Sequence, residues 1–160
     1  MSGRDERPGI GPWLGRVGAR AALALLWVLH LLPLPILAAL GRGLGRLLHA
    51  LARSRRRVAL RNVQRCLPAM GAAAQHALVR EHFEYLGRSL LERGVLWWAS
   101  PARLRRLIDV QGEVALAEQS TARFMWVVPH FLALEVAGVA TQLFQSRPVT
   151  AFYQRQSNPV

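Results

Sequence analysis

A histidine and a glutamate five residues apart, His130 and Glu135, form the constellation in this sequence best suited to acid–base chemistry. Two helical residues at this spacing differ by about 140° in direction, because each residue turns an α-helix by about 100°. The side chains can therefore meet if His130 lies on a loop and Glu135 lies in the first turns of the helix that follows. A histidine oriented by a carboxylate can act as a general base toward a hydroxyl group. The alternative is a buried histidine with satisfied hydrogen bonds and no role in catalysis.

The elements around this pair are expected to form a sheet with helices packed on it. The apolar run of residues 124–128 ends just before His130 and is typical of a strand buried on both faces. Ligands of open α/β sheets bind beyond the carboxyl ends of the strands, where His130 falls. Short strands are also expected at 108–110 and 149–153, and helices at 113–119 and 132–144. This alternation predicts an α/β fold with a mostly parallel sheet.

A helical region is predicted upstream of the sheet. Apolar residues in the segment 73–98 recur at spacings of four, three and four, and these residues are Val79, Phe83, Leu86 and Leu90. The pair Ser100–Pro101 then indicates a new helix, with serine as its cap and proline at its first position.

The N-terminal part contains an apolar run, residues 21–40, whose only ionisable side chain is His30. Its length suits a bilayer crossing, although Pro33 and Pro35 disfavour one straight helix. No cleavage site of a signal peptide follows the run, so the sequence predicts a retained membrane helix. A single span and a kinked hairpin in the cytoplasmic leaflet both remain open.

The charge is strongly basic, since 21 basic residues face 9 acidic ones and the net charge is +12; every basic residue is arginine. Such a balance favours polyanionic partners. Many of the arginines border the apolar run, which favours contact with anionic lipid headgroups, although a solvated helix face explains any single one equally well. No nucleic-acid partner is expected, because no nucleic-acid-binding motif accompanies them. The single cysteine, Cys66, excludes an intramolecular disulfide, and we expect it to be a small buried side chain.

Four segments carry a resemblance to a known family. The block from His130 to Glu135 resembles the H-x4-D/E motif of the lysophospholipid acyltransferase superfamily. Three further blocks narrow the resemblance to the bacterial lipid A biosynthesis (lauroyl/myristoyl) acyltransferases, and they are residues 57–68 (RVALRNVQRCLP), 108–113 (IDVQGE) and 153–159 (YQRQSNP). The last block departs from the family pattern, because Gln154 follows the tyrosine and the arginine comes one place later.

The resemblance implies transfer of a fatty acyl chain from the thioester of acyl carrier protein to a hydroxyl of a lipid A precursor. His130 would be the base and Glu135 its orienting partner, with no acyl-enzyme intermediate. The substrate would be held by Arg155, Asn158 and Phe131, and no metal or tightly bound cofactor would be needed. The enzyme would act at the bacterial inner membrane, with its active site on the cytoplasmic side.

The same resemblance predicts two parts, namely residues 1–52 as membrane anchor with basic flank and residues 53–160 as a partial acyltransferase domain. Because the family's members are about twice as long, we expect this chain to be an N-terminal fragment that is inactive alone. Two alternatives remain. One is an acyltransferase that acts on another lysophospholipid or glycolipid, and the other is a basic membrane-binding protein without catalytic activity.

Overall fold

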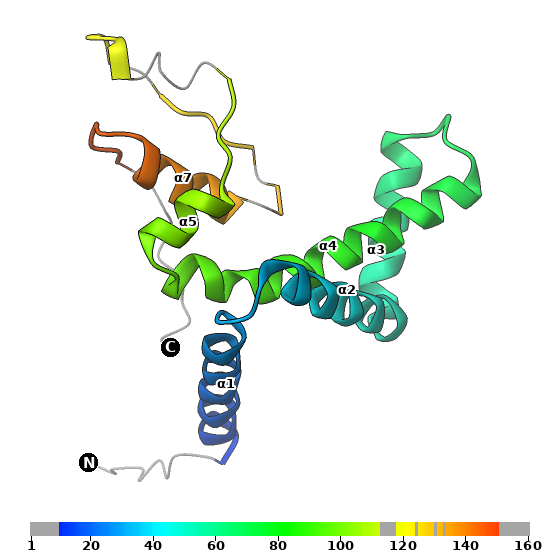
Figure 1. The fold of residues 1–160 in the computed structure, drawn as a ribbon. Coiled ribbons are helices and arrows are strands. Elements are labelled where there is room, and N and C mark those ends of the chain that lie inside the picture. Colours follow the sequence, from blue (N-terminus) through cyan, green and yellow to red (C-terminus); the bar gives the residue numbers. More distant parts are fainter. Residues whose placement is uncertain (1–9, 113–117, 124, 130, 133, 151–160) are drawn as a thin grey trace, which may run out of the picture.

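The chain is built from helices in the residues that the structure describes. The computed structural model describes residues 10–112, 118–123, 125–129, 131–132 and 134–150. The helices are α1 (Ile10–Leu29), α2 (Leu34–Leu51), α3 (Arg53–Cys66), α4 (Ala72–Trp98), α5 (Pro101–Leu107) and α7 (Leu134–Phe144). In Figure 1, α4 crosses the centre with α2 alongside it. Helix α1 connects to the N-terminal end of α2, whereas α5 and α7 lie near the C-terminal end of α4.

Glycines allow α2 and α4 to approach until their backbones touch. A Cβ atom added at Gly41 would lie 2.5 Å from the Cα atom of Arg88, and one at Gly45 would lie 2.5 Å from that of Glu84. On the α4 side, a Cβ at Gly87 would meet the carbonyl oxygen of Gly41 and would lie 2.8 Å from Gly45 Cα. Small residues at a helix crossing permit such an approach, so these three glycines set the distance between the two helices.

Pro33 and Arg103 stabilise the turn between α1 and α2. Helix α1 ends at Leu29, and Pro33, with extended backbone angles, precedes α2. From α5, Arg103 donates hydrogen bonds to the carbonyl oxygens of His30 (2.6 Å) and Leu32 (2.7 Å). These carbonyls follow the end of a helix, where partners within the helix are missing. The guanidinium group therefore fixes the angle at which the chain turns into α2.

The helices predicted from apolar spacing and capping residues are confirmed. The segment expected at 73–98 forms α4, and the one expected at 132–144 forms α7 from Leu134 onward. Ser100 caps α5 by accepting a hydrogen bond from the backbone N–H of Arg103 (3.3 Å). A small core joins α2, α4 and α5 through the buried side chains of Leu37, Val95 and Leu104.

The prediction of an α/β fold with a parallel sheet is wrong for the described residues, which contain no strand. Residues 108–110, 125–128 and 149–150 are all extended or irregular without pairing. Met125 and Val127, expected inside a sheet, are 85% and 84% exposed. An apolar run becomes a buried strand only when neighbouring strands accept its backbone hydrogen bonds, and that pairing is not encoded locally. Residue 124 and residues 151–153 of these predicted strands lie outside the described residues, as do residues 113–117 of one predicted helix.

The predicted membrane helix is also not found. Among the helices that the structure describes, none is both long and apolar enough to cross a bilayer. The apolar run of residues 21–40 is divided between α1 and α2 by the corner at Pro33, and each half continues into a segment with arginines. Cys66 differs from expectation as well, because it is exposed at the end of α3. The expected division at residue 52 stays a prediction.

His49 lies where α2 packs against α4. Its ring lies edge-on to the ring of Phe83, with the centroids 5.4 Å apart. Burial lowers the pKa of His49 below its ordinary value, and the nearby Arg56, Arg80 and His76 lower it further. The folded state therefore binds fewer protons than the unfolded state once the pH falls toward the ordinary histidine pKa of about 6.5.

We expect the contribution of neutral His49 to stability to be complete above about pH 6.5 and to decline as the pH falls toward its lower folded-state pKa. Thermal unfolding followed from pH 8 to pH 5 by circular dichroism measures this decline. In His49→Gln, which has no titrating ring, the slope between pH 6.5 and pH 5 should be smaller. An unchanged slope would show that His49 does not carry the effect.

Candidate active site

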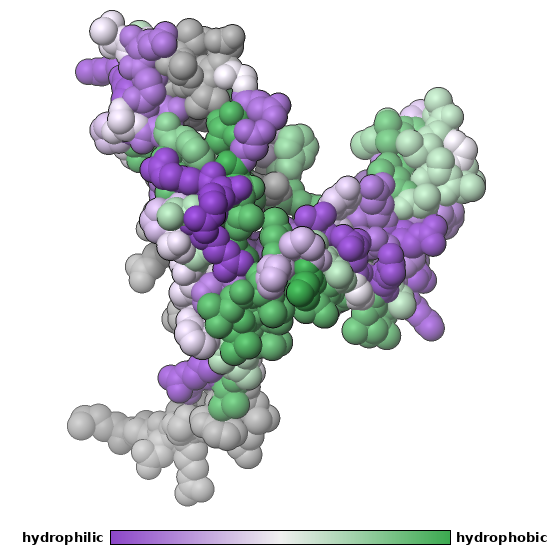
Figure 2. Space-filling view, viewed as in Figure 1, coloured by the Kyte–Doolittle hydropathy of each residue, from purple (hydrophilic) through white to green (hydrophobic). Residues whose placement is uncertain are grey.

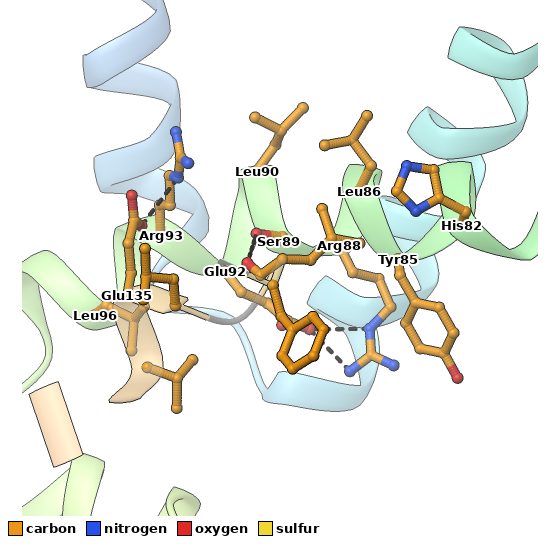
Figure 3. A pocket seen from close by; sticks show the side chains of 14 residues that line it. His82, Tyr85, Leu86, Arg88, Ser89, Leu90, Glu92, Arg93, Leu96 and Glu135 are labelled. Atoms are coloured by element: carbon orange, nitrogen blue, oxygen red, sulfur yellow. Dashed lines mark hydrogen bonds and ion pairs between the residues drawn. The ribbon is translucent and has the colours of Figure 1, made fainter. Parts of the chain in front are cut away.

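A groove of about 800 Å³ lies between α4 and the start of α7. Figure 3 shows side chains that line it, with Arg93 of α4 beside Glu135 of α7 and, further along α4, Arg88 beside Glu92. Its lining residues are His82, Tyr85, Leu86, Arg88, Ser89, Leu90, Glu92, Arg93, Leu96, Phe131, Leu132, Leu134, Glu135 and Val136. Among the polar residues, His82, Ser89 and Arg93 recur along α4 at nearly whole numbers of helical turns, which places them on one face.

Glu135 enters this groove from the first turn of α7. A carboxylate is favoured there, because the free N–H groups of a helix N-terminus carry partial positive charge. Its Oε2 atom lies 3.0 Å from Nε of Arg93, and the two side chains are 41% and 38% exposed. Figure 3 shows the two side chains pointing toward one another from their separate helices. The groove therefore contains an ion pair between α4 and α7.

A second contact fixes the segment before α7. The hydroxyl of Ser89 donates a hydrogen bond to the carbonyl oxygen of Leu132 (3.1 Å). In the same segment, the backbone N–H of Phe131 donates to the carbonyl oxygen of Pro129 (2.9 Å), and that of Leu134 donates to Phe131 (3.1 Å). The chain thus turns tightly between the apolar run and α7. Glu135 is placed by local turns on one side and by α4 on the other.

The predicted site residues divide into two groups. Glu135 and Phe131 both line the groove, and Phe131 is largely exposed within it. His130, Arg155 and Asn158 lie outside the described residues. The structure adds Arg93 and Ser89, which the sequence analysis did not identify. Their four-residue spacing on a helix was visible, but nothing local indicated that this face of α4 meets the H-x4-E segment.

A second groove, of about 720 Å³, lies nearer the N-terminal end of α4. It runs between α3, α4 and the end of α2, and it shares His82 and Leu86 with the first groove. The described residues that line it are mostly apolar, and they include one arginine, Arg55. Nothing in the described part of the chain brings together three side chains of the metal-binding types.

Comparison with known proteins identifies the family of this chain. Residues 13–160 match the family model of the bacterial lipid A biosynthesis acyltransferases, and the chain belongs to that family. This match confirms the family indicated by the four sequence blocks.

Individual relatives agree with this assignment. The chain is 31% identical over 138 residues to a lipid A biosynthesis palmitoleoyltransferase of Escherichia coli, covering 85% of this chain and 44% of the relative. It is 31% identical over 150 residues to the lauroyltransferase of the same organism (92% and 46%). A lipid A biosynthesis acyltransferase of Haemophilus influenzae is 30% identical over 150 residues (92% and 45%). The chain spans about half the length of these curated relatives. No solved structure matches it significantly.

Proposed function

We propose that this chain is part of an acyltransferase that moves a fatty acyl chain from acyl carrier protein to a hydroxyl of a lipid A precursor. The observation that carries the proposal is Glu135 of the H-x4-E segment, held in a groove of a chain that belongs to the lipid A acyltransferase family. The named relatives transfer lauroyl and palmitoleoyl groups in lipid A biosynthesis. A groove with an apolar floor and polar groups at one side suits a substrate with both an acyl chain and a polar head.

The proposed reaction is a direct displacement. His130 removes the proton of the acceptor hydroxyl while the oxygen attacks the thioester carbonyl, and Glu135 orients the imidazole and stabilises its charged form. A C–O bond forms, the C–S bond breaks, and the proton on His130 passes to the departing thiolate. Arg155 is assigned to a phosphate of the acceptor, because its planar guanidinium suits phosphate geometry. Asn158 and Phe131 are assigned to substrate binding, and no metal or bound cofactor is required.

The same proposal places the enzyme at the bacterial inner membrane, facing the cytoplasm. Exposed apolar side chains on α2 recur at spacings of four, seven and four, and these are Ile36, Leu40, Leu47 and Leu51. Figure 2 shows apolar surface gathered around the α1–α2 corner, with hydrophilic surface beside it. An apolar face on a helix that also carries a basic side chain, here Arg42, is typical of helices at a membrane surface.

The acceptor distinguishes this proposal from its alternatives. The intact protein, meaning the acyltransferase of which this chain is proposed to be a part, would be incubated with acyl carrier protein thioester. The acceptor would be either a lipid A precursor or a lysophospholipid. We expect an ester product with the lipid A precursor and little or none with the lysophospholipid. The reverse preference would support the other acyltransferase, and no product with either acceptor would support a non-catalytic membrane-binding protein.

A further inference from the structure

Arg93 is the basic side chain that pairs with Glu135 in the described part of the chain. The two residues lie on different helices, and Nε of Arg93 lies 3.0 Å from Oε2 of Glu135 (Figure 3). This Nε atom is buried, and its N–H group has no well-aligned hydrogen-bond acceptor among the described residues. The contact between the two side chains is therefore an ion pair without an aligned hydrogen bond. Removal of either partner leaves the other without its compensating charge.

The neighbouring arginine is already paired. Arg88 contacts Glu92 through Nε (3.1 Å) and through a terminal nitrogen (3.0 Å), an arrangement within one turn of α4. Arg93 instead reaches across to α7, four residues after Ser89, which holds the carbonyl of Leu132. Ser89 and Arg93, about one helical turn apart on α4, thus contact Leu132 and Glu135 in the segment that follows His130. Of these contacts, only the one from Arg93 acts on the carboxylate itself.

We propose that Arg93 is a positioning residue for acyl transfer, a role that rests on the function proposed above. The charge of Arg93 draws Oε2 of Glu135 toward α4, which leaves Oε1 available to orient the imidazole of His130. The rate then depends on Arg93 only through Glu135. A contribution of Arg93 through other contacts would persist when Glu135 is changed, whereas a role through this carboxylate would not. A role confined to stability would leave kcat per folded molecule unchanged.

The test is a double-mutant cycle in the intact protein, with kcat and KM measured for acyl transfer to the lipid A precursor. Arg93→Met should lower kcat by roughly tenfold to a hundredfold with little change in KM, since misplacement of a catalytic group costs rate at this scale. Arg93→Lys should restore most of the rate, because a single ion-pair contact needs the charge more than the fork of donors. In a Glu135→Gln background, Arg93→Met should cause no further loss.

The matched control is a second ion pair between helices in the described part of the chain, Arg46 Nε with Glu84 Oε1 (2.9 Å), which lies outside both grooves. Arg46→Met should leave kcat unchanged. Equal losses from Arg93→Met in the wild-type and Glu135→Gln backgrounds would overturn the proposal, as would an unchanged kcat in Arg93→Met. A wild-type protein without acyl transfer would instead overturn the proposed function, and the role of Arg93 with it.

Discussion

Substitution of Gly87 by alanine is expected to lower the free energy of unfolding by about 3 kcal/mol or more, at the upper end of what overpacking costs. The added methyl group would meet backbone atoms of both Gly41 and Gly45, which cannot rotate away as a side chain can. Helix α2 would have to move away from α4 where Gly41 and Gly45 pack on Gly87. Since the total stability of a domain is about 5–15 kcal/mol, this loss is a large part of it. Urea unfolding followed by circular dichroism measures the change.

Gly43 provides the control, because it lies on α2 between the two packed glycines but has open space around it. Gly43→Ala should stabilise the protein by about 0.5–1 kcal/mol, as alanine is the better helix former. If Gly87→Ala proved as stable as wild type, the close approach of α2 to α4 would be incorrect.

Substitution of Glu135 by glutamine is expected to lower the rate of acyl transfer in the intact protein by about two to four orders of magnitude. Glutamine keeps the shape of the side chain but loses the charge that stabilises the imidazolium form of His130. It also loses the ion pair with Arg93, so the side chain is no longer held from α4. Initial rates with acyl carrier protein thioester and lipid A precursor measure the loss.

Glu118→Gln is the matched control, since Glu118 is an exposed carboxylate that lines neither groove. It accepts hydrogen bonds from the backbone N–H of Ser146 (2.6 Å) and from the backbone of Arg147. We expect the rate of acyl transfer by Glu118→Gln to equal that of wild type. Equal rates in wild type and Glu135→Gln would remove Glu135 from the catalytic pair.

Local features of the sequence predicted the local structure well. The apolar spacing around Val79 and Phe83 identified α4, and both side chains are buried against its neighbours. Ser100 and Pro101 set the start of α5 through capping chemistry, which depends on a few adjacent residues. The prolines likewise predicted the break that separates α1 from α2.

Features that depend on distant residues could not be predicted in this way. The apolar run at 125–128 was interpreted as a strand, but composition does not show whether other strands pair with it. Gly41 and Gly45 carried no signal of their own in the sequence, and only the structure shows that they admit the backbone of α4. Arg93 gave no signal either, because its partner Glu135 lies on another helix. The family motif supplied the identity of the carboxylate, and only the fold supplied the residue that holds it.

The most direct test of the proposed chemistry compares wild type with His130→Ala in the intact protein. Purified protein is incubated with acyl carrier protein thioester and lipid A precursor, and the precursor is analysed by mass spectrometry over time. We predict that wild type adds one acyl group to the precursor. His130→Ala should add it about two to four orders of magnitude more slowly, with the same helical content and the same membrane fraction. Turnover by His130→Ala close to that of wild type would contradict a general-base role for His130 and, with it, the mechanism proposed for this acyltransferase.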